Sequence, residues 1–340
     1  MNMIETKNLT KTYQRFTKEP GLKGSIKSLF KREFVTKTAV SSFDLTVSEG
    51  EFIGLIGPNG AGKTTLVKML TGIIAPTSGD ISVVGYYPNK LENSFKLNYA
   101  VVMGQKSQLF FDLSAADTFL LFKELYHIPD KEYQDNLDYF IELFGVADLL
   151  NVQVRTLSLG ERMKLELIVA LLHNPKILFL DEPTIGLDAV AQKQIRRFLK
   201  EVNETKGTTI ILTSHYMEDI KSLCKRCVVI NGGMKLYDGD TDQLFAKYQT
   251  HKKITISMEK EETCSLNQEH TLLEAVPYKI SLLVRKEHSQ ELLRDVLSRY
   301  DLNDISIEEE DIGNVVERIY NDKSGALTAA SIMQQGGVNE

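Results

Sequence analysis

The sequence predicts an α/β fold: a mostly parallel sheet core with an antiparallel β subdomain and a helical subdomain, followed by a small C-terminal α+β domain. Over residues 177–245, short and almost continuously apolar segments alternate with helical ones, which is typical of a parallel sheet buried on both faces. From about 112 to 173, apolar residues recur three and four positions apart, which indicates amphipathic helices. After about residue 250, short strand-like and helix-like segments predict a separate small domain.

These segments divide the chain into two expected domains. The first covers residues 1–247, begins with β-rich segments over 3–100 and contains the helical subdomain at about 110–173. The second is an accessory α+β domain at 250–322, because KITISM, YKISLLV and DISIEEE have the pattern of strands, whereas SQELLRDVLSRY and IGNVVERIY have helical spacing. The tail, residues 323–340, is expected to be disordered.

Residues 17–37 interrupt the first β-rich region with a basic amphipathic segment. Its apolar residues stand at helical spacing among lysines and an arginine, which predicts a helix: Leu22, Ile26, Leu29 and Phe30. Such a helix could lie near a membrane or a partner subunit. It could equally be an inserted surface helix that packs on its own domain, and the sequence leaves both interpretations open.

Composition and charge limit the classes of protein to which the chain can belong. Of its 340 residues 42% are hydrophobic and 25% charged, with a formal net charge of -6, which gives no reason to expect nucleic acid as a partner. No apolar run reaches the roughly 18 to 20 residues that span a bilayer, and the N-terminus lacks a secretory signal pattern. A membrane role would therefore be exercised from the cytoplasmic face, through another protein. The three cysteines predict neither a disulfide framework nor a metal site: Cys224, Cys227 and Cys264.

The segment GPNGAGKT, residues 57–64, lies between a predicted strand (EFIGLI) and a predicted helix (TTLVKMLTGI), which is the context of a P-loop. Its glycines let the backbone turn N–H groups toward a phosphate, and the following helix directs its positive end to the same place. Lys63 is expected to bind the β- and γ-phosphates of ATP, and the Thr64 hydroxyl to ligate Mg²⁺. The predicted nucleotide-binding residues of this loop are Gly57, Pro58, Asn59, Gly60, Ala61, Gly62, Lys63, Thr64 and Thr65.

The apolar segment ILFLDE, residues 177–182, ends with two carboxylates. A buried strand that carries acids at its carboxyl end is costly unless those charges meet a cation, and strand carboxyl ends are where an open α/β sheet binds its ligand. Asp181 is therefore expected to hold Mg²⁺, directly or through water. Glu182 is the candidate base that activates the attacking water.

Three further segments distinguish among P-loop proteins. LSLGE (157–161) begins a predicted helix, IGLD (185–188) follows the two acids, and His215 follows the apolar segment TIILTS. With the motifs above, residues 3 to about 245 resemble the ATP-binding proteins of ABC transporters, which have a P-loop nucleotide-hydrolase fold of ABC type. The resemblance assigns catalytic roles to Gln105 and His215, an Mg²⁺-ligand role to Gln105, nucleotide contacts to Ser158, Gly160 and Asp188, and adenine stacking to Tyr13, with Phe16 or Phe34 as alternatives.

The resemblance implies that Ser158 and Gly160 bind ATP held by another subunit. Two copies, or this chain and a paralogue, would then pair head to tail and hydrolyse ATP between them. Leu159 and Glu161 depart from the family's LSGGQ pattern, but the serine and the second glycine remain, so an active ATPase is expected. The insertion, the signature and the appended domain are similar to the NatA-like, drug-resistance branch, which implies separate integral membrane permeases and, commonly, export.

Two other functions are compatible with such a nucleotide-binding domain. A soluble ABC ATPase that acts on ribosomes or nucleic acid usually carries two ATPase domains or long coiled coils, and this sequence shows neither. A regulatory ATPase would use residues 250–322 as a small-molecule sensor, whereas stabilisation of the dimer is the simpler expectation for that domain. The sequence does not identify the transported substrate or the permease.

Overall fold

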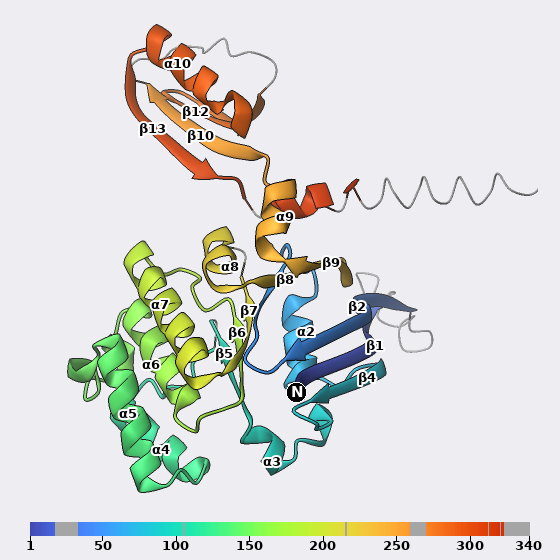
Figure 1. Cartoon of the computed structure of the whole chain (residues 1–340), viewed down its shortest axis with the longest axis vertical. Helices are drawn as coiled ribbons and strands as arrows, with labels where there is room; N and C mark the ends of the chain where they lie inside the picture. Colours follow the sequence, from blue (N-terminus) through green and yellow to red (C-terminus); the bar gives the residue numbers. More distant parts are fainter. Residues whose placement is uncertain are drawn as a thin grey trace, which may run out of the picture. The chain divides into compact units, whose positions relative to one another are not determined.

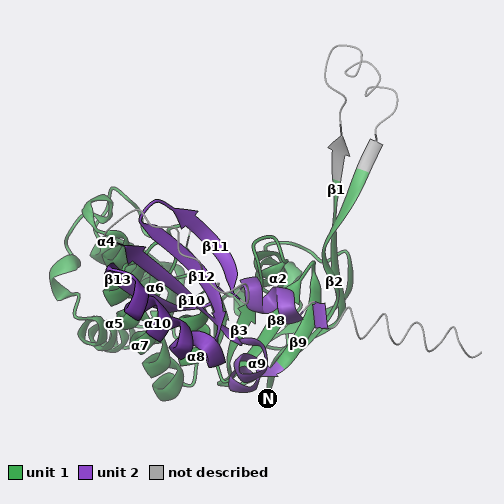
Figure 2. Cartoon of the chain, turned by 90° about the horizontal axis from the view of Figure 1, so that it is seen from above, with its two compact units in different colours: residues 1–238 green, residues 239–340 purple. Residues whose placement is uncertain are grey.

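A computed structural model describes residues 1–17, 33–104, 106–214, 216–258, 270–311, 313–319 and 321–322. The chain divides into two compact units, Met1–Asp238 and Gly239–Glu340 (Figure 2). The division falls before helix α9 (Thr241–Tyr248), which the sequence placed at the end of the first domain. In the described parts of the chain, no helix is long and apolar enough to cross a membrane.

The first unit is built on a six-stranded sheet with the order β5-β6-β7-β3-β8-β9. Its pairings from β5 to β8 are parallel, and the two-residue turn Gly232-Gly233 leads from β8 into β9. The strands β3, β7 and the first four residues of β6 are fully buried, as continuous apolar segments between helices require. The strands are β3 (Phe52–Ile56), β5 (Tyr99–Met103), β6 (Ile177–Asp181), β7 (Thr209–Thr213), β8 (Arg226–Asn231) and β9 (Met234–Asp240).

A second sheet of this unit is antiparallel, with the order β2-β1-β4. Its strands are β1 (Asn2–Thr17), β2 (Glu33–Ser48) and β4 (Ser78–Val83). The pairing of β1 with β2 continues outward to Thr17 and Glu33, so the predicted helix is wrong at its two ends, residue 17 and residues 33–37. These ends are rich in β-branched residues, which pack well across paired strands and offset the helical spacing of the apolar residues. Residues 18–32, the middle of that prediction, lie outside the described residues.

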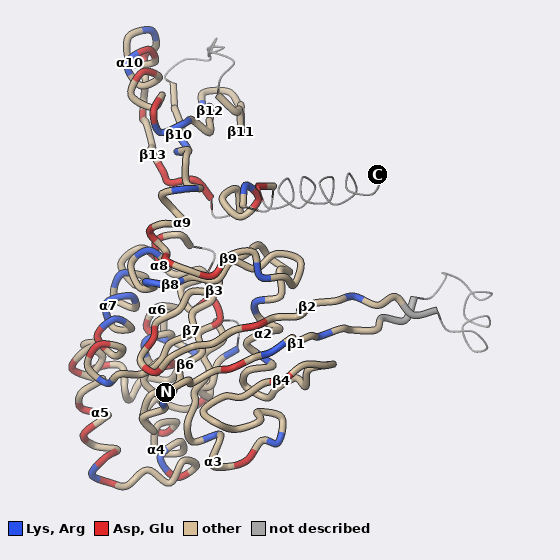
Figure 3. Tube along the Cα trace, turned by 45° about the vertical axis from the view of Figure 1, so that its right-hand side comes forward, with Lys and Arg blue, Asp and Glu red and all other residues tan. Residues whose placement is uncertain are grey.

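The helices of the first unit have the bounds α2 (Lys63–Leu70), α3 (Asn93–Lys96), α4 (Ala115–Leu125), α5 (Asp130–Phe144), α6 (Leu159–Leu171), α7 (Ala189–Lys206) and α8 (Met217–Leu223). Short 3₁₀ turns occur at Pro88–Lys90, Ala147–Leu149 and Val154–Thr156. Helices α4 to α7 gather on the side of the β5 and β6 strands, away from the antiparallel sheet (Figure 1). Charged residues are distributed along them, mostly acidic on α5 and of both signs on α7 (Figure 3).

Helix α2 packs between the two sheets of the first unit. It contacts β2 and β4 on one side and β6 on the other. Its buried residues Leu66, Val67 and Met69 belong to one apolar cluster with Ile53 of β3 and Phe179 of β6. Because helix and strand are both fixed by this burial, the loop between β3 and α2 is held at the carboxyl edge of the parallel sheet.

The second unit contains α9 and a four-stranded antiparallel sheet with the order β11-β12-β10-β13. Helix α10 covers one face of this sheet, where Leu292 and Val296 pack on Ile254, Ile256 and Leu282. The elements are β10 (His251–Met258), β11 (Thr271–Val276), β12 (Lys279–Arg285), a 3₁₀ turn at Lys286–His288, α10 (Ser289–Arg299) and β13 (Leu302–Glu309). Residues 313–319 are helical.

Candidate active site

The loop from Gly57 to Gly62 carries the start of α2 toward the carboxyl edge of the sheet. Gly62, the N-cap of α2, has a φ of 114°, and no side chain caps the helix. A Cβ there would stand 2.4 Å from the Ala39 carbonyl oxygen, and one at Gly57 would stand 2.2 Å from the Ile230 carbonyl oxygen. The loop therefore requires glycine at these positions, and it leaves the first N–H groups of α2 open to an anion.

Lys63 begins α2 and has a side chain only 5% exposed. Its Nζ donates to the carbonyl oxygens of Gly57 at 2.7 Å and Pro58 at 3.2 Å, and lies 3.9 Å from Oε1 of Glu182. Burial lowers the pKa of Lys63 from its ordinary value, while the carboxylates of Glu182 and Asp181 oppose that shift. A desolvated ammonium in this position would gain strongly from the charge of a phosphate.

Asp181 lies at the end of β6, where two hydroxyl groups meet its carboxylate. Thr64 Oγ1 donates to Oδ2 at 2.9 Å, and Thr213 Oγ1 donates to Oδ1 at 2.6 Å. Carboxylate and hydroxyl oxygens are the ligands that Mg²⁺ prefers, so Asp181 and Thr64 could hold this ion together. The sequence did not point to Thr213. The sequence could have indicated Thr213 by its place at the end of an apolar strand. The structure shows that this strand lies next to β6, with Thr213 in register with Asp181.

Glu182 follows β6 in a backbone conformation that is rare for its residue type, with a φ of 54°. Its N–H donates to the carbonyl oxygen of Thr213 at 3.0 Å, which holds the turn. Gly104 approaches this turn so closely that a Cβ would stand 2.5 Å from the Glu182 carbonyl oxygen. A pocket of about 310 Å³ lies between these segments, lined by Asn59, Thr64, Lys68, Met103, Gly104, Lys106, Asp181, Glu182 and Ile185.

Asp219 of α8 is a buried carboxylate that the sequence analysis missed. Its Oδ2 accepts hydrogen bonds from Thr184 Oγ1 at 2.5 Å and Ser214 Oγ at 2.9 Å, and its Oδ1 accepts from Arg196 Nη1 at 2.9 Å. Thr184 lies two residues after Glu182, and Ser214 directly precedes the predicted catalytic residue His215. One buried carboxylate therefore links the segments that carry two of the three predicted catalytic residues, Glu182 and His215.

The predicted signature residues lie away from this pocket. Ser158 is exposed and caps α6, and its Oγ accepts from the Glu161 N–H at 3.3 Å while the Glu161 carboxylate accepts from the Ser158 N–H at 2.8 Å. The hydrogen bonds from Ser158 lower the pKa of Glu161. Asp188 caps α7, and its Oδ1 accepts from the Ala191 N–H at 2.8 Å. A Cβ at Gly160 would stand 3.0 Å from that of Ala191, so the structure brings the segments that carry Gly160 and Asp188 together. Ile185, the first residue of the IGLD segment, lines the pocket, whereas Ser158, Gly160 and Asp188 do not.

The other predicted site residues have different outcomes. Tyr13 is half-buried in β1, with Lys11 Nζ 5.3 Å from its ring centroid. Phe16 and Phe34 pair across β1 and β2. Gln105 and His215 lie outside the described residues. Cys224 and Cys227 are buried, and among the described residues no group of three potential ligands is placed to bind a metal.

Known proteins were compared with this chain. Residues 40–185 match the ABC transporter family. The chain is 32% identical over 222 residues to the ABC transporter ATP-binding protein NatA of Bacillus subtilis (strain 168), which covers 65% of this chain and 90% of NatA. It is 32% identical over 217 residues to the linearmycin resistance ATP-binding protein LnrL of the same organism, covering 64% of this chain and 69% of LnrL.

The fold is similar to that of a dimeric ATP-binding cassette in a post-hydrolysis state bound to ADP and Pi, with a TM-score of 0.58 and 23% identity over 70% of this chain and 99% of that chain. The match to NatA covers 90% of that protein. The family match, residues 40–185, includes the residues that line the pocket as well as Ser158 and Gly160. The chain belongs to the family of ABC transporter ATP-binding proteins, as the motifs of its sequence predicted.

Proposed function

We propose that this protein hydrolyses ATP in a head-to-tail dimer and thereby drives export through a separate integral membrane permease. One observation carries the proposal: the predicted signature residue Ser158 is exposed and does not line the pocket of the same chain. The pocket at Lys63, Asp181 and Glu182 lacks the signature residues, whereas Ser158 is exposed at the start of another helix. A second copy, or a paralogous ATPase subunit, would complete each pocket with its own Ser158 and Gly160.

In this proposal, Lys63 and the open N–H groups at the start of α2 bind the phosphates of ATP. Asp181 and Thr64, and by family resemblance Gln105, hold Mg²⁺, which when bound would offset the negative charge that develops on the phosphates. Glu182 accepts the proton of the water whose oxygen attacks the γ-phosphorus. As that bond forms, the bond from the γ-phosphorus to the bridging oxygen breaks, and ADP and phosphate result.

The remaining predicted residues receive supporting roles. His215 would hold Glu182 and the attacking water in register, and Tyr13 would stack on adenine. Asp188, at the start of α7, would contact the nucleotide site across the dimer. The second unit, in which we place the accessory domain of residues 250–322, would stabilise the dimer. The assembly would work at the cytoplasmic face of the cell membrane.

The proposal is tested by purifying the tagged protein from detergent-solubilised membranes of cells that produce it with its genomic neighbours. We expect an integral membrane protein to co-purify in about equal amount. The same preparation should hydrolyse ATP in the presence of Mg²⁺ and lose that activity when Mg²⁺ is chelated. Recovery of ribosomal proteins in place of a membrane protein would overturn the transport assignment.

A further inference from the structure

Glu166 is a buried carboxylate in the middle of α6. Its side chain is 4% exposed, and its neighbours Leu165, Leu167 and Ile168 are fully buried. A charged group surrounded by apolar side chains is costly unless it is hydrogen-bonded. Its partners therefore show what this residue holds.

The carboxylate of Glu166 accepts hydrogen bonds from the polar groups of one loop, residues 107–109. The Gln108 N–H donates at 3.0 Å to both carboxylate oxygens, and the Leu109 N–H donates to Oε1 at 3.3 Å. Ser107 Oγ donates to Oε1 as well. Because backbone N–H groups must find acceptors when they are buried, this loop depends on the carboxylate for its conformation.

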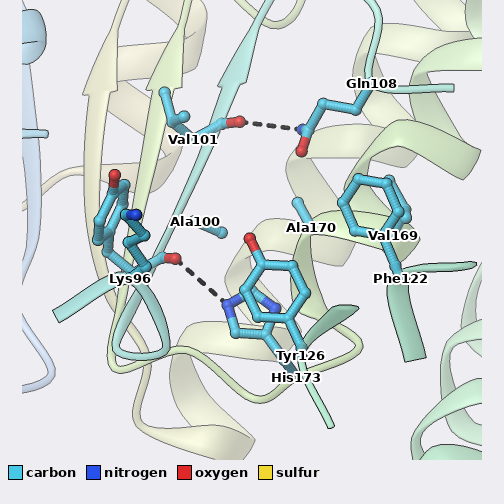
Figure 4. Close-up of a pocket in the computed structure, with 10 residues that line it drawn as sticks. Lys96, Ala100, Val101, Gln108, Phe122, Tyr126, Val169, Ala170 and His173 are labelled. Carbon is cyan, nitrogen blue, oxygen red and sulfur yellow. Dashed lines mark hydrogen bonds between the residues drawn. The ribbon is translucent and has the colours of Figure 1, made fainter. Parts of the chain in front are cut away.

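Neighbouring turns of α6 strengthen the attachment. The guanidinium of Arg162, one turn before Glu166, lies 5.4 Å from the ring centroid of Phe111. His173, just beyond the helix, has its Nε2 3.2 Å from the Tyr99 carbonyl oxygen. The loop also returns to β5, because Gln108 Nε2 donates to the Val101 carbonyl oxygen at 3.0 Å. Figure 4 shows this bond and that of His173 in one pocket.

The loop held by Glu166 continues directly into a wall of the nucleotide pocket. Met103, Gly104 and Lys106 line that pocket together with Thr64 and Asp181. The Lys106 N–H donates to the Met103 carbonyl oxygen at 2.9 Å, and Lys106 directly precedes the loop. A shift of residues 107–109 would therefore displace the pocket wall.

We propose that Glu166 is a positioning residue that fastens this wall, formed by Met103, Gly104 and Lys106, to the helix whose first turn carries Ser158 and Gly160. The inference rests on the proposed function, because it makes α6 a link between two nucleotides. One is held in the protein's own pocket, and the other is presented by the partner at the start of α6. When the partner's nucleotide docks on Ser158 and moves α6, Glu166 carries the pocket wall with it.

The contact itself is tested by hydrogen exchange on the full-length protein without nucleotide. Glu166→Gln keeps the size of the side chain but removes its charge and places an amide N–H₂ against backbone donors. We expect the Gln108 and Leu109 amides to exchange about tenfold faster or more, since hydrogen bonds to a charged group are among the stronger ones. Glu204→Gln, an exposed change on α7, is the matched control and should leave both amides unchanged. If the Gln108 and Leu109 amides of Glu166→Gln exchanged as slowly as in the wild type, Glu166 would not hold the loop, whether or not the protein is an ATPase.

The consequence for the reaction is tested by separating binding from turnover. For Glu166→Gln we expect kcat to fall about tenfold, while the Kd for ATP, measured by calorimetry, changes less than about threefold. Ser107→Ala removes one of the hydrogen bonds to Glu166 and should cause a smaller fall in kcat, again with little change in the Kd for ATP. The double variant should be no slower than Glu166→Gln alone, because both changes act on one contact. Additive losses, or a wild-type kcat in Glu166→Gln, would contradict the inference, whereas absent turnover in the wild type would contradict the proposed function.

Discussion

The ammonium of Lys63 and the carboxylate of Glu182 lie 3.9 Å apart at the pocket, and the lysine is almost fully buried. The phosphate-binding cation and the candidate base are therefore electrostatically coupled before any nucleotide arrives. Burial favours the neutral form of Lys63, and the negative charge of Glu182 helps to keep it protonated. Removing the charge of Glu182 should therefore lower the pKa of Lys63 further.

Glu182→Gln should separate ATP binding from ATP hydrolysis. Loss of the base should reduce turnover by about a hundredfold or more, while the P-loop contacts that bind ATP remain. The variant should then accumulate as an ATP-bound dimer. Phosphate release measures the first effect, and light scattering with and without ATP measures the second. Retention of a substantial fraction of wild-type turnover would show that another group activates the water.

Ser158→Ala should impair hydrolysis beyond its effect on helix stability. Ser114 is an internal control, because it caps α4 with the same reciprocal pair of hydrogen bonds, to Asp117. Each alanine variant should lose about 1 kcal/mol of stability from the missing cap. Ser158→Ala should in addition reduce phosphate release by the purified protein about tenfold or more, whereas Ser114→Ala should not. Equal activity in the two variants would remove Ser158 from the nucleotide site.

Asp219→Asn should disturb both segments that flank the catalytic groups. The change removes the buried carboxylate that pairs with Arg196 and leaves, among the described residues, only the exposed Glu218 as its partner, so we expect a loss of about 3 kcal/mol in the free energy of unfolding. Turnover should fall more than ATP affinity, since Thr184 and Ser214 lose their common acceptor. Glu218 is the other partner of Arg196, and the side chain of Glu218 is 76% exposed. Glu218→Gln should therefore lower the free energy of unfolding by less than about 1 kcal/mol. Denaturant unfolding and phosphate release compare the two. Similar effects of both changes would refute the special role of Asp219.

His173 should make the first unit less stable in acid. Burial lowers the pKa of His173 to about 4. The unfolded chain, with a histidine pKa of about 6.5, therefore binds an additional proton between these values, and stability falls as the pH decreases from 6.5 toward 4. The full effect is about 3 kcal/mol. His173→Gln should flatten this part of the stability curve, measured by denaturant unfolding. His127→Asn, at an exposed position with a φ of 52°, should retain the wild-type slope. An unchanged slope in His173→Gln would show that other groups cause the acid sensitivity.

The sequence by itself determined the features that depend on neighbours along the chain. Glycines before Lys63 must form a loop between strand and helix, and an apolar strand that ends in Asp181 and Glu182 must place its acids at the carboxyl edge of the sheet. Serine three residues before an acid starts a helix at Ser158. Each of these is a local rule of backbone geometry, so the loop before Lys63, the acids at the end of β6 and the helix start at Ser158 could be predicted without coordinates.

The tertiary structure decided which side chains hold that site in place. Thr213 contacts Asp181 because the two residues are in register on neighbouring strands. Asp219 contacts Thr184, which lies 35 residues earlier in the chain. Glu166 contacts a loop that lies 57 to 59 residues earlier in the chain. Residues 33–37 likewise form strand because β1 offers a partner, although they follow apolar residues at helical spacing. Hydrogen bonds between distant segments leave no periodic pattern in a single sequence, because their partners become neighbours only when the chain has folded.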